Sequence, residues 1–276
     1  GIELAVLSLH APGIQGIVDP VEALTISRKA NNRLAAAVAS RPERYAALAA
    51  LPMHDAEIAA TELTRCVTQL DFKGCMVNGF QQVGNRDTVH YYDHPDYREF
   101  WNVVAELDVP FYLHPRMQIP SRSQNYDGHP WLMSAPWGFA VETSIHALRL
   151  CGSGVFDEFP NLRICLGHLG ETIPFGLWRI DSRMQFSPRG YRGKRPLGDY
   201  FRENFHLTTS GNFDDASFRC TLDVFDHDRI YYSADYPFER MSDASDWFDA
   251  TDVISDGLRV AMGRTNAIRL LNLSLN

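Results

Sequence analysis

The stretch LRICLGHLGE, residues 162–171, indicates the fold more directly than any other part of the chain. It starts as a run of apolar residues and ends in a polar group, with His168 followed by Gly170 and Glu171. A strand that is apolar on nearly every residue is typical of a parallel sheet covered on both faces, because a half-exposed strand alternates apolar with polar residues. We therefore expect a buried parallel strand with functional groups at its carboxyl end.

Similar runs recur along the chain and alternate with helical patterns. Strands are predicted at Leu4–Leu9, Tyr45–Leu51, Lys73–Phe80, Pro110–His114, Leu162–Leu169, His206–Ser210 and Ile230–Asp235. Helices are predicted at Asp19–Ser40, Asp55–Leu70, Pro95–Leu107, Pro136–Cys151, Glu171–Phe186, Asp214–Phe225, Asp243–Val253 and Gly263–Leu271. Strand–helix alternation indicates a parallel α/β sheet, and a closed (β/α)8 TIM-like barrel needs eight strands. The seven runs thus predict such a barrel without its first β/α unit.

An open, doubly wound sheet is the alternative fold. Such sheets often bind phosphates through loops such as G-x-G-x-x-G, and no predicted strand is followed by one. No change of composition marks a linker, so residues 1–276 are interpreted as one barrel domain, N-terminally incomplete because Gly1 directly precedes a core strand. Two long connections, Gln118–Ala135 and Pro188–Asp199, are typical of lids or subunit contacts.

Composition and charge exclude several classes of partner. The 276 residues carry a formal net charge of −8, which argues against a nucleic-acid surface and against a polybasic membrane patch. A small anionic substrate could still bind beside an arginine or a metal ion. No apolar run approaches the ~18 residues of a transmembrane helix. The five cysteines form no C-x-x-C pair, which indicates free thiols in a reducing cytoplasm.

Titratable side chains stand at the carboxyl ends of three predicted strands, namely His114, His168 and Asp235. In a barrel these ends meet at one mouth, so the pattern predicts a shared metal site or acid–base site. Imidazole and carboxylate groups together suit Zn²⁺, Mn²⁺ or Fe²⁺. A lone histidine is more often a hydrogen-bonded structural group, and only the common position of the three favours a site. His10 and His54 also follow strand ends closely.

Four further residues are candidates for the same site. Glu171 could hold a neighbouring imidazole in one tautomer, or could be only an acid in the first turn of a helix. Arg179, in the segment WRID, could bind a carboxylate through two hydrogen bonds, or could pair with a nearby aspartate without a function. Phe139 and Phe238 could form a wall against a flat aromatic ligand, or could belong to the core.

Seven motifs occur in the order FYLHPR, LGHLGE, WRID, LTTSGNF, SADYPFE, SDWFDA and GRTNAIRL. Together they resemble the metal-dependent decarboxylase branch of the amidohydrolase superfamily, closest to the γ-resorcylate (2,6-dihydroxybenzoate) decarboxylases and near the 2,3-dihydroxybenzoate and salicylate decarboxylases. The resemblance runs from Gly1 to Leu273 almost without gaps. It implies a (β/α)8 barrel, one divalent metal ion per subunit, zinc or manganese, and no organic cofactor.

The resemblance also implies roles for individual residues. His114 and Asp235 would bind the metal, together with a Glu-x-His pair on a first strand that has no counterpart in this sequence. Asp235 would also deliver a proton, assisted by the pair His168 and Glu171. Arg179 would reach the site of a neighbouring subunit, which implies a homo-oligomer, a tetramer.

The implied reaction is non-oxidative decarboxylation of an ortho-hydroxybenzoate to the phenol, reversible as a carboxylation. The substrate would be a small aromatic carboxylic acid. Two alternatives remain open. The same scaffold could carry a metal-dependent hydrolase of a lactone or an amide. It could also be a barrel that binds a ligand without catalysis.

Overall fold

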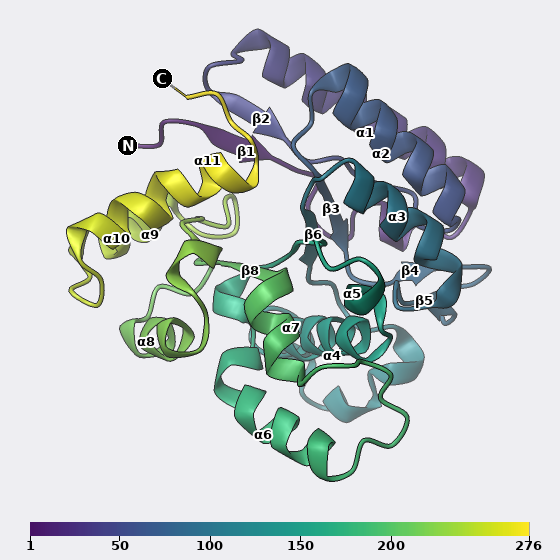
Figure 1. Ribbon diagram of the computed structural model, residues 1–276. Helices are drawn as coiled ribbons and strands as arrows, with labels where there is room; N and C mark the ends of the chain where they lie inside the picture. The colour runs from purple at the N-terminus through teal and green to yellow at the C-terminus, as the bar shows by residue number, and fades with distance from the viewer. Residues whose placement is uncertain (276) are drawn as a thin grey trace.

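The computed structural model describes residues 1–275, and parallel strands form its centre (Figure 1). These strands are β1 (Ala5–Leu7), β2 (Tyr45–Ala47), β3 (Cys75–Asn78), β6 (Phe111–His114), β7 (Ile164–Leu166), β8 (Phe205–Thr208) and β9 (Ile230–Tyr231). β1 pairs with β2, the remaining five pair in the order β3-β6-β7-β8-β9, and a parallel bridge between Ala49 and Cys75 lies between the two sets. The predicted parallel α/β sheet is confirmed, with shorter strands than the apolar runs suggested.

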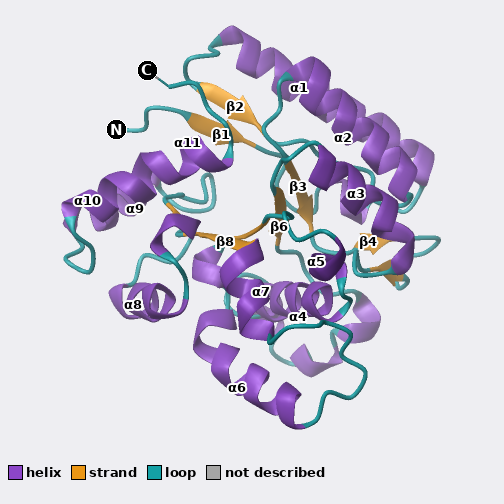
Figure 2. Ribbon diagram, viewed as in Figure 1, coloured by secondary structure: helices purple, strands orange, loops and turns teal. Residues whose placement is uncertain are grey.

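Helices surround the strands (Figure 2). They are α1 (Pro20–Ser40), α2 (Ala56–Leu70), α3 (Arg98–Glu106), α4 (Gly138–Gly152), α5 (Val155–Glu158), α6 (Ile173–Phe186), α7 (Leu197–Asn204), α8 (Asp215–Val224), α9 (Met241–Ala250), α10 (Asp256–Val260) and α11 (Asn266–Leu270). The predicted start of α1 is confirmed, because Asp19 accepts a hydrogen bond from the backbone N–H of Glu22 at 2.8 Å and Pro20 occupies the first position. Such a cap satisfies one of the backbone donors left free at a helix start.

Two predicted segments differ from the structure, and one hairpin was not predicted. The helix expected from Glu171 begins at Ile173, because Glu171 has a φ of 60° and cannot continue a right-handed helix. The connection expected at Pro188–Asp199 ends in the first turn of α7, an amphipathic helix that was not predicted. A short antiparallel hairpin of β4 (Gln81–Gln82) and β5 (Val89–His90) follows β3, and two-residue strands are too short to show a period.

The central strands have two different faces. On β6, Phe111 and Leu113 are fully buried against the helices, whereas Tyr112 and His114 point to the other face and are partly exposed. Successive side chains of a strand alternate between faces, so the residue that ends β6 shares its face with Tyr112. This alternation places His114 on the inner side of the sheet, away from the helix-covered core.

Contacts between side chains connect the two ends of the strand row. No pairing between β1 and β9 occurs in the sheets of residues 1–275. Glu3, before β1, forms an ion pair with Arg264 at 2.7 Å. His10, after β1, packs its ring against Phe238 with centroids 5.2 Å apart. The edges of the row are therefore linked at both the amino and the carboxyl ends of the strands.

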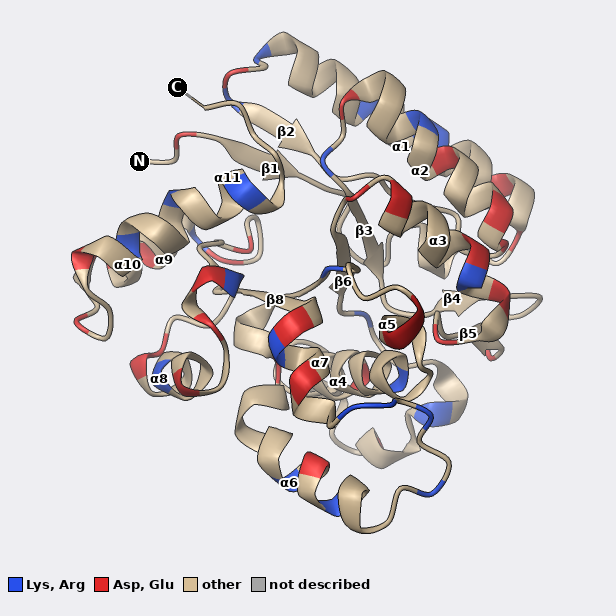
Figure 3. Ribbon diagram, in the orientation of Figure 1, with Lys and Arg blue, Asp and Glu red and all other residues tan. Residues whose placement is uncertain are grey.

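Charged side chains lie on the helices and loops, and the strands carry none of them (Figure 3). Within residues 1–275, no helix is both long enough and apolar enough to cross a bilayer. A charged side chain on a strand that helices cover would be buried, and burying an unpaired ion costs free energy. This cost accounts for the position of the charged side chains outside the strands.

Two buried histidines make the stability of the fold depend on pH. Burial lowers the pKa of His146 and of His206 to about 3, whereas a histidine in an unfolded chain titrates near ~6.5. Between these values the unfolded chain binds more protons than the folded chain. The free energy of unfolding should therefore fall with decreasing pH, by about 1.4 kcal/mol per pH unit for each histidine, when it is measured by urea unfolding between about pH 6 and 4.5.

A matched pair of variants isolates one of these histidines. His206→Gln should reduce the pH slope by about 1.4 kcal/mol per unit, whatever it does to stability at neutral pH. The exposed His129 serves as the control, and His129→Gln should leave the slope unchanged. If the slope of unfolding free energy against pH were unaltered in His206→Gln, the His206 ring would have the same pKa in the folded and the unfolded chain.

Candidate active site

Three side chains from separate strands converge at the carboxyl ends of the sheet. His114 is the last residue of β6, His168 follows β7, and Asp235 follows β9. The Nε2 atom of His168 lies 3.6 Å from Oδ2 of Asp235, and the rings of His114 and His168 have centroids 6.4 Å apart. We refer to these three residues as the strand-end group. Their predicted convergence is confirmed.

His168 is held between two carboxylates. Its Nδ1 atom lies 2.8 Å from Oε1 of Glu171, whose side chain is almost fully buried, and its Nε2 faces Asp235. Burial by itself would lower the pKa of His168, but Glu171 and Asp235 outweigh burial and raise the pKa to about 10. The ring is thus an imidazolium with a donor directed at each carboxylate.

The backbone of these loops adopts conformations that side chains rarely take. His168, Leu169, Glu171 and Asp235 all have positive φ values, between 52° and 68°. Left-handed geometry costs roughly 1–2 kcal/mol for a residue with a Cβ and is concentrated at functional sites. It turns the chain sharply after each strand, and as a result the side chains of both loops lie close together.

Gly211 faces the same contact from the loop after β8. It has a φ of 63°, and a Cβ built there would lie 3.1 Å from the His168 ring and 3.2 Å from Oδ2 of Asp235. Both distances are tighter than ordinary van der Waals contact. Glycine is therefore required at residue 211 by its backbone conformation and by the closeness of the two side chains.

The ring of His114 is suited to bind a metal ion. Burial lowers its pKa to about 4, the charge of His168 adds to the effect, and the ring is therefore neutral near pH 7. Its Nδ1 lies 3.0 Å from the carbonyl oxygen of Pro115, so Nδ1 carries the proton and the lone pair is on Nε2. Imidazole nitrogen beside the carboxylate of Asp235 is a donor set that Mn²⁺ and Zn²⁺ accept. These residues fit two of the ligand positions of a divalent ion, although no group of three or more such side chains is found within residues 1–275.

A chain of hydroxyl groups lies beneath the strand-end group, and the sequence analysis did not identify it. The Tyr112 hydroxyl lies 2.9 Å from Oγ1 of Thr208, which lies 2.8 Å from Oγ of Ser210. Ser210 in turn accepts a hydrogen bond from the backbone N–H of His168 at 3.3 Å. The available signal was the alternation in FYLH, which puts Tyr112 on the face of His114, and the polar run TTSG after β8.

Residues 4–273 match the sequence family described as amidohydrolase. The chain belongs to the amidohydrolase family. One relative, the gamma-resorcylate decarboxylase of Rhizobium sp. (strain MTP-10005), is 52% identical over 276 residues, which cover 99% of this chain and 84% of the relative. The predicted resemblance is thereby confirmed.

Solved structures of other amidohydrolases have the same fold. The crystal structure of 2,6-dihydroxybenzoate decarboxylase from Rhizobium has a TM-score of 0.95 and 52% identity, covering 98% of this chain and 84% of that one. The dihydroxybenzoic acid decarboxylase from Polaromonas sp. JS666, with bound manganese and the inhibitor 2-nitroresorcinol, has a TM-score of 0.97 and 48% identity, covering 100% and 83%.

The remaining candidates of this amidohydrolase lie at different distances from the strand-end group. Phe238 is near it, because its backbone N–H donates to the carbonyl oxygen of Asp235 at 2.9 Å. Phe139 is partly buried near the start of α4 and makes none of the ring contacts found within residues 1–275. Arg179 is exposed on α6, and the nearby Asp181 accepts a hydrogen bond from the backbone N–H of Leu197.

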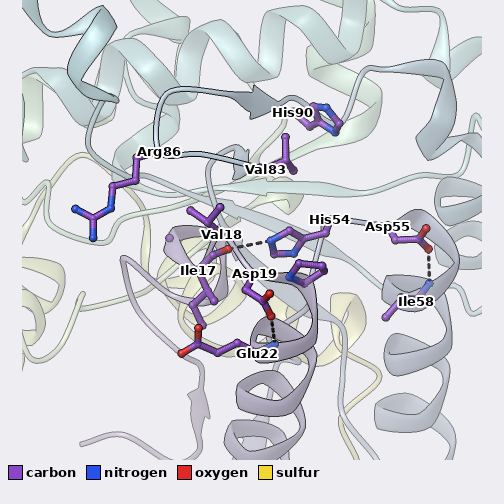
Figure 4. Close-up of a pocket in the computed structure, with 13 residues that line it drawn as sticks. Ile17, Val18, Asp19, Glu22, His54, Asp55, Ile58, Val83, Arg86 and His90 are labelled. Atoms are coloured by element: carbon purple, nitrogen blue, oxygen red, sulfur yellow. Dashed lines mark hydrogen bonds between the residues drawn. The ribbon is translucent and has the colours of Figure 1, made fainter.

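A separate cavity of about 1040 Å³ opens beside the starts of α1 and α2 and the β4–β5 hairpin (Figure 4). His54 faces it with Nε2 bound to the carbonyl oxygen of Ile17 at 2.9 Å, and burial lowers the pKa of that ring. No member of the strand-end group lines it. Gln81 and Arg116 donate hydrogen bonds to the backbone carbonyl oxygens of Gln15 and Ile17 in the segment before α1. The cavity and the strand-end group are therefore two separate places in the fold.

Gly211→Ala should disturb the contact between His168 and Asp235. Both variants Gly211→Ala and Gly84→Ala place a Cβ at a left-handed φ, which costs roughly 1–2 kcal/mol of stability, but the space around Gly84 is open. Only Gly211→Ala should therefore move the His168 ring from Asp235 and lower its pKa below about 10, as followed by NMR titration of the ring. The same His168 titration in both variants would contradict this geometry.

Proposed function

We propose that this chain catalyses the metal-dependent, non-oxidative decarboxylation of an ortho-hydroxybenzoate, with 2,6-dihydroxybenzoate as the substrate and resorcinol and CO₂ as the products. The observation that carries the proposal is the contact between the His168 imidazolium and the Asp235 carboxylate beside a neutral His114. The decarboxylase names of relatives at 52% identity support the same reaction.

We propose that residues 1–276 belong to one domain and that their seven parallel strands are part of a (β/α)8 barrel. The consecutive order of parallel strands and the contacts between the two ends of the row support this arrangement. The unpaired edges of β1 and β9 are where an eighth strand, the first β/α unit of such a barrel, would pair. Side chains at the carboxyl end of that strand would complete the ligand set.

His114 through Nε2 and Asp235 through its carboxylate would hold one divalent ion per subunit, manganese or zinc, and no organic cofactor is required. When bound, such an ion supplies Lewis acidity that lowers the pKa of a phenol and orients its carboxylate. Bound manganese in the Polaromonas structure supports this assignment.

The role of Asp235 follows from the chemistry of the ring. Direct loss of CO₂ would leave an aryl carbanion in the ring plane, where the π system cannot stabilise it. Protonation of the carboxyl-bearing carbon comes first, and the ortho oxygen supplies electron density to that carbon. Asp235 would deliver this proton. The carbon–carbon bond then breaks, its electron pair restores the aromatic ring, and CO₂ leaves.

His168 would act on the proton donor through its charge. Its imidazolium lies 3.6 Å from Asp235, so it would help set the protonation of Asp235 or stabilise the charged intermediate. Glu171 holds the ring from its other nitrogen and keeps its Nε2 directed at Asp235. At high bicarbonate the same steps would run in reverse and carboxylate a phenol.

We propose a homo-oligomer, a tetramer, in which α6 lies at a subunit contact. Phe175, Trp178 and Phe186 on this helix are 91%, 78% and 81% exposed, and α6 lies at the periphery of the chain in Figure 1. Monomers rarely expose so many large apolar side chains together. Arg179 is exposed on the same helix and would bind the substrate carboxylate in a neighbouring subunit.

A cytoplasmic location completes the proposal. The cysteines at 66, 75, 151, 165 and 220 are all free thiols in the structure. Free thiols persist in reducing compartments.

Asp235→Asn tests the proton donor. With manganese bound, release of CO₂ and resorcinol from 2,6-dihydroxybenzoate should fall by about 10²–10⁴-fold, because the amide cannot supply the proton. Asp246→Asn, an exposed change on α9, is the control and should keep full activity. Near-normal turnover by Asp235→Asn with its metal retained would remove Asp235 from proton transfer. A wild-type chain that opens lactones and releases no CO₂ would identify a hydrolase instead.

A mixture of two inactive variants tests the role of Arg179. Oligomers of Arg179→Ala alone or Asp235→Asn alone should lose most activity. Co-expressed chains should regain a measurable fraction, because a site with a native Asp235 can then receive Arg179 from its neighbour. Arg183→Ala, one turn further along α6, is the control and should be active alone. Mixed oligomers as inactive as their parents would exclude a shared site.

A further inference from the structure

A third histidine lies beside the strand-end group, at the edge of the sheet. His10 follows β1, whereas His114 ends and His168 follows strands in the middle of the row. Its ring packs edge-on against Phe238, at 5.2 Å and 85°. The backbone of Phe238 is hydrogen-bonded to Asp235, so this contact holds His10 beside the turn that carries the proton donor.

The ring of His10 has one nitrogen occupied and one available. Nδ1 lies 2.7 Å from the carbonyl oxygen of Ala11, so in the neutral ring Nδ1 carries the proton and Nε2 is an acceptor. Within residues 1–275, none of the hydrogen bonds found involves this Nε2, and the side chain is exposed.

We propose that His10 is a specificity residue whose Nε2 accepts a hydrogen bond from the second ortho-hydroxyl of a 2,6-dihydroxybenzoate. The inference rests on the proposed decarboxylase function. It assigns a hydrogen-bond partner to the second ortho-hydroxyl of the substrate, which takes no part in the reaction itself. One ortho oxygen and the carboxylate take part in decarboxylation. The other hydroxyl lies across the carboxyl group and needs its own partner, which His10 supplies from a different strand.

A hydrogen-bond acceptor of this kind discriminates against a substrate that lacks the matching hydroxyl group. A site that hydrogen-bonds a hydroxyl group discriminates strongly against an analogue without it, because the polar group of the protein then loses its partner. His10 thus favours 2,6-dihydroxybenzoate over salicylate, which has a single ortho-hydroxyl. Phe238 contributes by fixing the orientation of the imidazole.

Two variants separate hydrogen bonding from packing. His10→Phe keeps an aromatic ring against Phe238 and removes the acceptor, whereas His10→Gln places an amide oxygen near the position of Nε2. In the manganese-loaded protein, His10→Phe should lower kcat/KM for 2,6-dihydroxybenzoate about tenfold or more and leave kcat/KM for salicylate within about threefold. His10→Gln should recover most of the loss in kcat/KM. The control His90→Gln, on β5, should leave kcat/KM unchanged for both substrates.

Inhibitor binding gives a second measurement that does not depend on turnover. The probes are 2-nitroresorcinol and 2-nitrophenol, which lacks one of the two hydroxyls, and calorimetry measures both with manganese present. His10→Phe should weaken 2-nitroresorcinol about tenfold and 2-nitrophenol hardly at all. The role of His10 would be overturned if His10→Phe lowered kcat/KM equally for 2,6-dihydroxybenzoate and salicylate and weakened 2-nitroresorcinol and 2-nitrophenol equally. This holds even if the protein is an active decarboxylase. A wild-type protein that prefers 2-nitroresorcinol but releases no CO₂ would instead overturn the proposed reaction and retain the role of His10.

Discussion

The arrangement of the site depends on one imidazolium held between two carboxylates. Glu171 and Asp235 belong to loops after different strands, and His168 bridges them with its two ring nitrogens. Each carboxylate alone would be a partly buried charge without a counterion, which is expensive. The shared positive ring neutralises this charge and sets the distance between the loops. The position of Asp235, and with it the proposed proton transfer, follows from that bridge.

The backbone accommodates the bridge with left-handed turns. Four side-chain-bearing residues of the two loops have positive φ values, and Gly211 leaves room where a third loop approaches. Such conformations persist only where surrounding contacts hold them. Here the contacts are the ion pairs of His168 and the hydroxyl chain through Ser210 to Tyr112.

Side chains near the candidate site come from both ends of the strand row. His10 and Phe238 lie in the loops that follow the first and last strands of the row, β1 and β9, and their rings are in contact. Arg179 and a set of exposed aromatic side chains lie together on α6. Their exposure on one helix is the basis for proposing a site shared between subunits.

The sequence by itself determined the order of strands and helices and the positions of His114, His168 and Asp235 at strand ends. Apolar runs and helix caps are local signals, and parallel strands place their carboxyl ends on one side wherever they pair. The start of α6, the hydroxyl chain and the pairing of His10 with Phe238 were decided only by the tertiary structure. Each depends on contacts between residues far apart in the chain, or on a backbone angle that no residue type enforces. For the same reason, the sequence identified Glu171 as a partner for an imidazole, while only the folded chain placed one imidazolium between two carboxylates.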